Sequence, residues 1–466
     1  MKNKGDYMLR LNLLDVCKAI GGNVLLNKGG VDIDFISLSS KDIKDKSLFI
    51  PIIGENLDGH NYMDDAYNNG CRMFLIDKNH SFKKDDITLV EVDDTTKAFG
   101  YIAKYYRNLF DIFYIGITGS VGKTSTKDII YSVLSTKYNT LKNEGNFNNE
   151  IGLPKTLLTL NDSYDLAVLE MGMSYKNEIR HLADIVRPKV AVISNIGLSH
   201  IEHFDNQDGI FDAKMEITSY FDKDNILVVN GDDKYLKTLK DKNYDYKIYS
   251  YGFDNNNDII CNDYSIVGDK IKFVATFLGD TYDVVIPSVA KHNIYNSMAA
   301  IVVGKIFNIS KEDIIKGLSD FSITKGRLSV INKKDITIID DSYNANSDSM
   351  ISALNVLKLY NKRRVAILGD ILEVGDYEEK IHREVGANIV GKADLLVTVG
   401  KASLYIKDEA IKKGFDKDKI LSFDNCDHLL LKIDNIIKKD DVILVKSSHG
   451  IGLSKVVEYL DGKYKD

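Results

Sequence analysis

The sequence has few of the residues that mark several common classes of protein. Its four cysteines, Cys17, Cys71, Cys261 and Cys426, are far apart and form no closely spaced pair of the kind that binds a metal. We therefore expect buried or half-buried thiols in a reducing compartment. Tryptophan is absent and the chain has only 4 prolines, which we interpret as a compositional bias of the source and not as a sign of function.

Neither long apolar runs nor an excess of one charge sign is present. No apolar stretch is long enough to span a bilayer, and Asp6 interrupts any apolar segment at the start, so we expect no signal peptide and no membrane insertion. The net charge of −7 is spread along the chain, which argues against a general nucleic-acid or membrane-surface binder. We expect a cytoplasmic protein that does not bind nucleic acid.

The length of 466 residues predicts two to four domains, each with its own core. The first hundred residues mix short strands and helices. Apolar runs predict strands at 47–53 and 72–77, and the segment 61–70 between them reads as a helix.

From residue 113 the pattern changes to alternating strands and helices. Short apolar runs at 113–118, 166–171 and 190–195 are separated by helical segments, which is typical of βαβ units around a parallel sheet. Between about 248 and 288, strands follow one another with turn signals, and we predict an antiparallel meander there. A helix is predicted at 290–307.

A second series of alternating strands and helices starts near Arg327. We predict its strands at 336–340, 364–368, 395–399 and 442–445. The changes of pattern place domain boundaries near residues 108 and 322.

The segment 114–126 has the features of a nucleotide-binding loop. An apolar run leads into a glycine-rich turn, and Gly122-Lys123-Thr124 opens a helix whose free amides and dipole would face phosphate. Lys123 can supply a charge to the β- and γ-phosphates, and the Thr124 hydroxyl can reach Mg²⁺. The glycines stand at 116, 119 and 122, and Ile117 occupies the position where the common phosphate-loop pattern has glycine. The motif indicates ATP or GTP without indicating its use.

Three residues further along could bind a metal or act in catalysis. Glu170 lies near the C-terminal end of a predicted buried strand, where it is either a Mg²⁺ ligand or a residue just past the sheet edge in solvent. His200 could be a metal ligand, a general base or a loop histidine. Lys214 lies on a predicted helix, where a solvated lysine is the default interpretation.

Another group of polar residues surrounds the second predicted boundary. Asn293 and Asn296 share a helix face and could contact an adenine edge, although helix capping by Asn293 is the alternative. Arg327 could meet a γ-phosphate or form a surface ion pair. Two aspartates and two asparagines lie at the end of the strand at 336–340, which is unusual if structure alone is at stake.

With these residues assembled, the chain resembles the Mur ligase family over essentially its full length. The matching strings are GITGSVGKT (116–124), GNFNNEIGLP (145–154), LEMG (169–172), AKMEI (213–217), HNIYN (292–296), DDSYNAN (340–346) and LGDILEVG (368–375), with His200. The last two strings mark one branch of the family, which joins a dipeptide to a nucleotide-linked peptide. Each string alone could occur by chance, but all of them in order are strong evidence.

The resemblance implies an α/β protein of three domains. These are an N-terminal UDP-sugar-binding α/β domain at 1–107, a central phosphate-loop ATPase with a mostly parallel sheet and an antiparallel meander at 108–321, and a Rossmann-like C-terminal ligase domain at 322–466.

The resemblance also implies roles for individual residues. Lys123, Lys214, Glu170 and His200 would be catalytic. ATP would be bound by Gly119, Ser120, Val121, Gly122, Lys123, Thr124, Ser125, Asn293, Asn296, Arg327 and Asp341, with Asp341 near the ribose. Magnesium would be held by Thr124, Glu170, His200 and Lys214, where Lys214 is the position that family members carbamylate. Substrate would be bound by Ser40, Phe49, Asn146, Asn148, Asn149, Tyr343, Asn344 and Asn346, with the segment 54–60 also in the UDP-sugar region.

The implied activity is ATP-dependent amide formation through an acyl phosphate, with ATP and Mg²⁺ as cofactors. It would join D-alanyl-D-alanine to UDP-N-acetylmuramoyl-tripeptide in peptidoglycan precursor synthesis, in a monomeric enzyme. A sister ligase shares the ATP and metal residues, but the strings at 343–346 and 368–375 argue against it. A nucleotide switch would need switch elements that are not evident, and a silent scaffold would be expected to have lost Glu170, His200 or Lys214.

Overall fold

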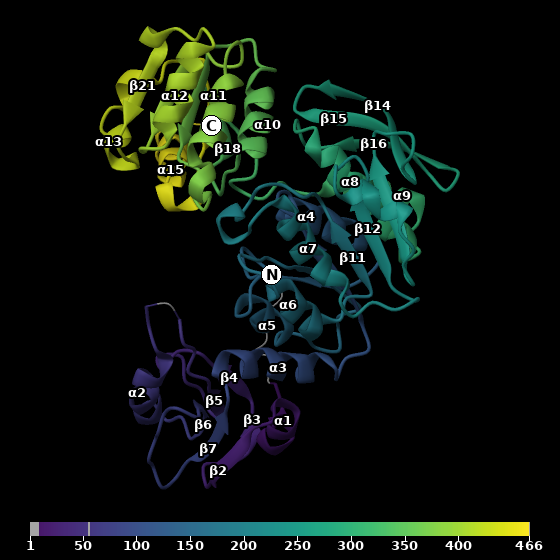
Figure 1. Cartoon of the computed structure of the whole chain (residues 1–466), viewed down its shortest axis with the longest axis vertical. Coiled ribbons are helices and arrows are strands. Elements are labelled where there is room, and N and C mark those ends of the chain that lie inside the picture. The colour runs from purple at the N-terminus through teal and green to yellow at the C-terminus, as the bar shows by residue number, and fades with distance from the viewer. Residues whose placement is uncertain (1–8, 55, 466) are drawn as a thin grey trace. The chain divides into compact units, whose positions relative to one another are not determined.

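The computed structural model describes residues 9–54 and 56–465 (Figure 1). The chain forms two compact units, and each unit is built from three segments that are not contiguous in the sequence. The described residues of Met1–Gly116, Tyr138–Ala191 and Glu216–Asn225 make the first unit, and Ile117–Lys137, Val192–Met215 and Ile226–Asp466 make the second. Within residues 9–54 and 56–465, no helix combines the length and apolarity that crossing a bilayer requires.

The N-terminal part is built on a five-stranded sheet in the order β2-β7-β6-β5-β4, parallel except for β2. Its elements are β1 (Leu11–Asn12), α1 (Leu13–Ile20), β2 (Asn23–Asn27), β3 (Asp32–Ile33), β4 (Phe35–Ser37), β5 (Ser47–Phe49), η1 (Gly59–Tyr62), α2 (Met63–Asn68), β6 (Met73–Asp77), β7 (Thr88–Val92) and α3 (Thr95–Arg107). The predicted strand at 47–53 ends early, because Pro51 has no amide hydrogen to continue the ladder. The predicted helix at 61–70 is confirmed only as η1 followed by α2.

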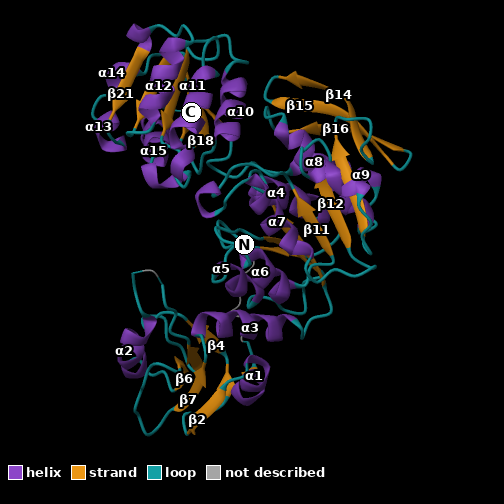
Figure 2. Cartoon of the chain, viewed as in Figure 1, coloured by secondary structure: helices purple, strands orange, loops and turns teal. Residues whose placement is uncertain are grey.

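The central part contains a nine-stranded sheet in the order β16-β15-β14-β13-β12-β11-β8-β10-β9. Its elements are β8 (Phe113–Thr118), α4 (Lys123–Leu134), β9 (Thr140–Lys142), α5 (Gly152–Leu157), β10 (Leu166–Glu170), α6 (Glu178–Val186), β11 (Val190–Ile193), η2 (Ile201–His203), α7 (Gln207–Met215), η3 (Glu216–Thr218), β12 (Ile226–Asn230), η4 (Leu236–Asp241), β13 (Lys247–Gly252), β14 (Ile259–Val267), β15 (Lys270–Phe277), β16 (Asp280–Ile286), α8 (His292–Ile306) and α9 (Lys311–Asp320). Figure 2 shows the alternation of helices and strands that the sequence pattern predicts.

The predicted antiparallel meander is partly wrong. β14, β15 and β16 are antiparallel and joined by tight turns, as expected. β13 instead pairs in parallel with both β12 and β14. The turn signals identified the hairpins between β14, β15 and β16. β13 is joined to β12 and β14 by longer connections, and no local sequence signal shows whether such strands pair in parallel or antiparallel.

The C-terminal part is a six-stranded sheet in the order β17-β18-β22-β19-β20-β21, parallel except for the edge strand β17. Its elements are β17 (Ser329–Asn332), β18 (Thr337–Asp341), α10 (Ser347–Leu357), β19 (Arg364–Gly369), η5 (Gly375–Tyr377), α11 (Glu378–Ala387), β20 (Leu395–Val399), α12 (Ser403–Lys412), η6 (Lys417–Lys419), β21 (Ile420–Phe423), α13 (Cys426–Leu430), α14 (Ile433–Ile436), β22 (Val442–Lys446), η7 (His449–Ile451) and α15 (Ser454–Lys463). The four predicted strands correspond to β18, β19, β20 and β22.

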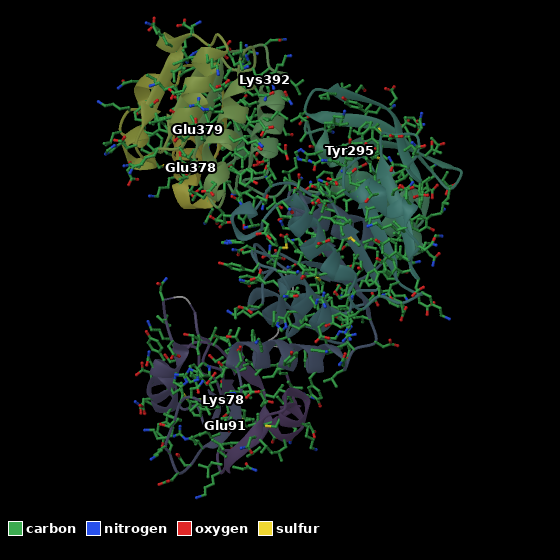
Figure 3. The ribbon with its side chains drawn as sticks, viewed as in Figure 1. Lys78, Glu91, Tyr295, Glu378, Glu379 and Lys392 are labelled. Atoms are coloured by element: carbon green, nitrogen blue, oxygen red, sulfur yellow. The ribbon has the colours of Figure 1, made fainter. Side chains whose placement is uncertain are left out.

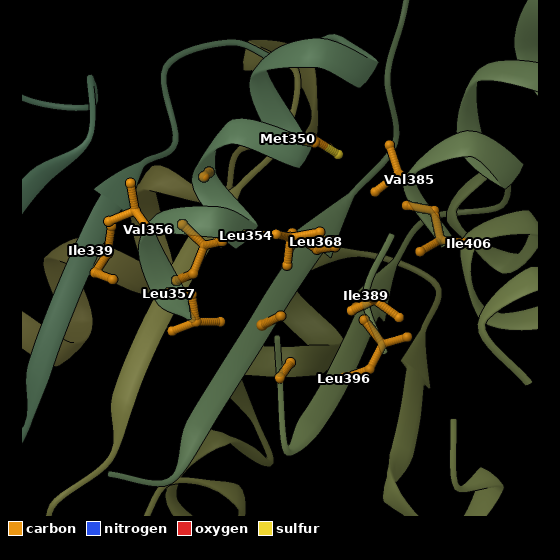
Figure 4. Close-up of a cluster of buried hydrophobic side chains, with 14 of the residues drawn as sticks. Ile339, Met350, Leu354, Val356, Leu357, Leu368, Val385, Ile389, Leu396 and Ile406 are labelled. Atoms are coloured by element: carbon orange, nitrogen blue, oxygen red, sulfur yellow. The ribbon is translucent and has the colours of Figure 1, made fainter. Parts of the chain in front are cut away.

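Both faces of this sheet are covered by helices. Successive side chains of a strand point to opposite faces of the sheet, so neighbouring residues belong to different cores. Ile339 belongs to the core with α10, α11 and α12, and Ile338 belongs to the core with α13, α14 and α15. Figure 4 shows the first of these cores, with Leu354 and Leu368 near its centre. Burial on both faces explains why the strands are continuous apolar runs, and the predicted α/β class with mostly parallel sheets is confirmed.

The four cysteines are buried free thiols, as predicted from their spacing. Burial raises the pKa of Cys17 and of Cys261 to about 11, so both are protonated at neutral pH. They are therefore packing residues of low reactivity.

Candidate functional site

The predicted strand, turn and helix of the phosphate loop are present. β8 is buried from Tyr114 to Thr118, and α4 begins at Lys123. Gly119 has a φ of 149°, and a Cβ atom there would lie 2.0 Å from Ser194 Oγ, so only glycine fits. Gly122 has a φ of 82° at the N-cap of α4. The loop therefore presents the amino end of a helix, as the glycine spacing predicts.

Asn195 holds the shape of this loop. Its side-chain oxygen accepts a hydrogen bond from the Val121 amide at 2.9 Å, and its carbonyl accepts one from the Ser120 amide at 3.1 Å. Asn195 was not among the site residues predicted from the sequence. It lies in the polar stretch that follows β11, which was the available signal.

Lys123 and Thr124 lie where the sequence places them, at the first turn of α4. The Lys123 ammonium folds back over the loop and donates to the carbonyl of Gly119 at 2.8 Å. Arg327 Nη2 donates to Thr124 Oγ1 at 3.4 Å, and the guanidinium lies 4.1 Å from the centre of the Tyr343 ring. The structure thus brings Arg327 to the phosphate loop, and its interpretation as a mere surface ion pair is wrong.

Lys214 is fully enclosed, with 2% of its surface exposed, on the predicted helix α7. The interpretation as a solvated lysine is therefore wrong. Burial, and secondly the charge of Lys123, holds the pKa of Lys214 well below its usual range. A lowered pKa raises the fraction of Lys214 in the unprotonated form, which is the form that can react as a nucleophile.

The two asparagines of α8 form a buried hydrogen-bond network with the phosphate-loop helix. Asn296 Nδ2 donates to Asn293 Oδ1 at 2.9 Å, and Thr126 Oγ1 donates to Asn296 Oδ1 at 2.9 Å. Helix capping by Asn293 is wrong, because the N-cap of α8 is Lys291 and no side chain caps it. Between the two asparagines, Tyr295 (Figure 3) donates to Asp232 at 2.9 Å.

In the first unit, Glu170 ends β10 and is 3% exposed, so its interpretation as a solvent-exposed residue past the sheet edge is wrong. Asn148 Nδ2 donates to Glu170 Oε1 at 2.7 Å. Asn143, which the sequence analysis missed, accepts from the Glu170 amide at 2.9 Å and donates to its carbonyl at 3.0 Å. The Asn148 hydrogen bond orients the Glu170 carboxyl group, and the two Asn143 hydrogen bonds hold its main chain.

The other predicted substrate residues of the first unit have different surroundings. Asn149 Oδ1 accepts from the amide of Gly152 at the start of α5, and Asn146 is exposed. The carbonyl of Ser40 accepts from Asn69. The Phe49 ring packs in the hydrophobic core, 1% exposed, which leaves only its main chain to contact a ligand.

His200 lies in the loop after β11 with a φ of 62°, and its Nδ1 is 2.6 Å from Glu373 Oε2. Asn346 Nδ2 donates to Ser199 Oγ at 3.2 Å and also caps α10. Residues far apart in the sequence therefore meet at the His200 loop.

Asp341, predicted to lie near a ribose, is buried in contact with Lys446. Lys446 Nζ lies 2.5 Å from Asp341 Oδ2 and donates to the carbonyl of Asn344 at 2.9 Å. Burial raises the pKa of Asp341 and lowers that of Lys446, while their mutual attraction opposes both shifts. Lys446 was not predicted as a site residue, because in the sequence it stands at the end of an apolar strand.

One further group of the described residues has the composition of a metal site. Asp58 contacts His60 Nδ1 at 2.7 Å and His80 Nε2 at 3.0 Å, and the two rings stack 3.7 Å apart. The remaining ring nitrogen of His60 accepts from the Asp77 amide. Stacked parallel rings cannot direct their lone pairs at one ion, so we interpret the group as a structural anchor for residues 56–60; Glu55 of the predicted 54–60 segment lies outside the described residues.

Three family models match the chain in sequence order. They are "Mur ligase family, catalytic domain" at residues 32–107, "Mur ligase middle domain" at 117–304, and "Mur ligase, glutamate ligase domain" at 326–449. The chain is also 38% identical over 430 residues to the UDP-N-acetylmuramoyl-tripeptide--D-alanyl-D-alanine ligase of Bacillus subtilis (strain 168), covering 91% of this chain and 92% of that protein. The chain belongs to the Mur ligase family.

Solved structures of Mur ligases have the same fold. A crystal structure of MurF from Acinetobacter baumannii superposes with a TM-score of 0.90 at 28% identity, over 98% of this chain and 100% of that one. MurF ligase from Thermotoga maritima in complex with ADP gives a TM-score of 0.81 at 25% identity, over 92% and 97%. The three-domain architecture of the Mur ligases that the sequence resemblance implied is thereby confirmed, while the boundaries near 108 and 322 stay predictions.

The donor groups of this Mur ligase suit a divalent cation. Thr124 offers a hydroxyl oxygen and Glu170 a buried, oriented carboxyl group, which are the oxygen ligands that Mg²⁺ prefers. Lys214 in its neutral form can become an oxygen donor by carbamylation. The metal and substrate roles of these residues stay predictions.

The Lys446–Asp341 contact predicts a large effect on stability. Lys446→Met should lower the free energy of unfolding by about 3–5 kcal/mol, because it leaves a buried carboxyl group without its partner. Urea denaturation followed by circular dichroism would measure this loss. Lys463→Met, which breaks the exposed pair with Asp434, should change it little; equal effects of the two variants would contradict the account.

His292 predicts a pH dependence of stability. Burial, and secondly the charge of Lys446, lowers its pKa to about 4. The unfolded chain, with a histidine pKa near 6.5, therefore binds a proton between about pH 6.5 and 4 that the folded chain does not, so stability falls as the pH falls through this window. The loss at pH 5 should be about 2 kcal/mol relative to pH 7.5. Unfolding at both pH values should show a smaller loss for His292→Gln than for the wild type, and identical losses would contradict this.

Proposed function

We propose that this chain joins D-alanyl-D-alanine to UDP-N-acetylmuramoyl-tripeptide with ATP, as a step of peptidoglycan precursor synthesis. The observation that carries the proposal is the likeness over nearly the whole chain to the B. subtilis protein of that name. The likeness to the ADP complex from T. maritima supports ATP as the nucleotide. The contact of Arg327 with the first turn of α4 supports transfer of a phosphoryl group at this loop.

The reaction would begin with phosphoryl transfer to the substrate. The terminal carboxylate of the tripeptide attacks the γ-phosphorus of ATP, and ADP leaves, which produces an acyl phosphate. Carboxylate and triphosphate are both anionic, so their approach requires cations. Lys123 and Arg327 supply two such charges beside the loop. Mg²⁺, held by Thr124, Glu170, His200 and Lys214 in this proposal, would supply further positive charge when bound.

Amide formation would follow in the same site. The amine of D-alanyl-D-alanine, in its neutral form, attacks the acyl carbon, and the tetrahedral intermediate expels phosphate while the amine loses its proton. Water must be kept from the acyl phosphate, since hydrolysis would waste the ATP. The contacts of Asn346 and Glu373 with the His200 loop would help to keep the C-terminal domain on the ATPase domain during this step.

Lys214 is the residue we assign to carbamylation. Its neutral amine would add to CO₂ and release one proton, which gives a carbamate anion in place of a cation. The low pKa supports this assignment, because only the unprotonated amine reacts. A negative group at this position also relieves the repulsion between Lys214 and Lys123.

The remaining assignments are part of the same proposal. ATP is bound by residues 119–125, Asn293, Asn296, Arg327 and Asp341. The UDP-sugar contacts Ser40, the main chain of Phe49 and the loop at 54–60, and the peptide contacts Asn146, Asn148, Asn149, Tyr343, Asn344 and Asn346. The three domains span 1–107, 108–321 and 322–466, and the enzyme is a cytoplasmic monomer.

Substrate profiling tests the choice of ligase. Phosphate release from ATP should require both UDP-N-acetylmuramoyl-tripeptide and D-alanyl-D-alanine. Single amino acids with shorter nucleotide-linked peptides, or glutamate with folate, should give no more than background. Preference for one of these pairs would mean that the chain is a different ligase of the same fold.

A further inference from the structure

The loop that carries His200 contacts two loop segments of the C-terminal part. The hydrogen bond from Asn346 to Ser199 is one contact. Gly375, with a φ of 49°, is another, since a Cβ atom there would lie 3.0 Å from Glu202 Cβ. The loop between β19 and α11 therefore packs closely against η2, directly after His200.

Glu373, in this same loop, contacts the His200 ring. Its Oε2 lies 2.6 Å from His200 Nδ1, in ion-pair contact and not in an aligned hydrogen bond. Both residues have left-handed backbones, with φ of 61° for Glu373 and 62° for His200. Such conformations are unfavourable outside glycine, and they persist where the surroundings fix them, often at functional sites. Two strained residues in mutual contact indicate a geometry that the fold enforces.

The loop that carries Glu373 is firmly anchored. The Ile371 amide donates to the buried His382 at 2.9 Å, and the Leu372 amide donates to Ser448 Oγ at 2.9 Å. The short helix η5 and then α11, whose first residues Glu378 and Glu379 are labelled in Figure 3, follow this loop. The Glu373 carboxylate is thus presented from a fixed backbone.

A carboxylate at Nδ1 determines what the other side of an imidazole can do. The negative charge of Glu373, 2.6 Å away, favours a proton on His200 Nδ1, and in the neutral ring Nε2 then keeps its lone pair. Carboxylates behind metal-bound histidines act in this way: they fix the ring orientation and raise the basicity of the coordinating nitrogen.

We propose that Glu373 is a positioning residue that orients His200 so that Nε2 faces the divalent cation. A residue of the loop between β19 and α11 thereby orients a ligand that the loop after β11 supplies. This rests on the proposed function in one respect, the assignment of His200 as a metal ligand.

Manganese binding tests this role without relying on turnover. Mn²⁺ would be titrated into protein saturated with ADP, and the free-ion electron paramagnetic resonance signal would be followed. His200→Ala should lose the Mn²⁺ site that depends on His200, and the loss identifies that site in the titration. Glu373→Gln should weaken the Mn²⁺ affinity of that site by about 10–100-fold, and Glu373→Asp should weaken it less. Glu384→Gln, on the exposed surface of α11, should leave it unchanged.

Two further outcomes separate the possibilities. If Glu373→Gln keeps wild-type Mn²⁺ affinity while His200→Ala loses the site, the inference is overturned and the proposed function stands. If His200→Ala also binds Mn²⁺ as the wild type does, the metal assignment of His200 and the inference fall together. A purely structural role for Glu373 would lower the melting temperature without moving the Mn²⁺ affinity of the folded protein, which would also overturn the inference.

Discussion

Lys123→Ala is expected to abolish ligation, with a loss of at least about 10³-fold in kcat/KM for ATP. Lys123 stands at the first turn of α4, and its ammonium already lies over the loop, 2.8 Å from the carbonyl of Gly119. A charge placed there stabilises the phosphates as negative charge moves between them in the transition state. Continuous phosphate detection with both peptide substrates would measure the loss.

The fold should survive this substitution. The Lys123 ammonium donates to the carbonyls of Gly119 and Ser120, and the side chain is not part of a hydrophobic core, so the melting temperature should change little. Lys412→Ala, an exposed lysine on α12, is the matched control and should keep wild-type activity. Near-normal ligation by Lys123→Ala would mean that the nucleotide is not held at this loop.

Lys214→Ala should cause the second large effect, a loss on the order of 10²–10³-fold that formate or acetate partly restores. The alanine variant lacks the amine that would carry the carbamate, and a small carboxylate can occupy the space that is left and replace the missing oxygens. Initial rates of ligation, measured with and without formate at about 0.1 M, would show the recovery of activity, which we expect to be about tenfold or more.

A matched control separates rescue from a general salt effect. Lys123→Ala should gain nothing from formate, because a carboxylate cannot replace a cation. A second readout is ¹³C resonance of the carbamate in wild-type protein under ¹³CO₂, which Lys214→Ala should lack. If Lys214→Ala keeps near-normal turnover without added formate or acetate, the carbamate assignment is wrong.

Local sequence patterns predicted the parts of the site that depend on chain geometry. The phosphate loop is an example. Its backbone must turn at Gly119 and start a helix at Lys123, and these conformations need glycine, so the glycines in the sequence predict both the turn and the helix start. Glu170 was predicted correctly at the end of a strand, because a buried strand appears in the sequence as an apolar run and ends where that run ends. The full set of strings identified the family, which the comparisons then confirmed.

What sequence patterns could not predict depends on burial and on distant partners. Lys214 lies on a helix of mixed polarity, and nothing in that helix shows that it is enclosed next to another lysine. Asn143 and Lys446 act through partners 27 and 105 positions away, at Glu170 and Asp341. The contact of Glu373 with His200 spans 173 positions. Such pairs follow from the tertiary fold alone.

The central claim is that this chain transfers the γ-phosphate to a carboxylate and not to water. The most direct test uses UDP-N-acetylmuramoyl-tripeptide labelled with ¹⁸O in its terminal carboxylate, together with ATP, Mg²⁺ and D-alanyl-D-alanine. Mass spectrometry should find the pentapeptide product and one ¹⁸O atom in each released phosphate, since the acyl phosphate carries a substrate oxygen to phosphorus. Phosphate that forms without the pentapeptide, or that contains no ¹⁸O, would contradict the account.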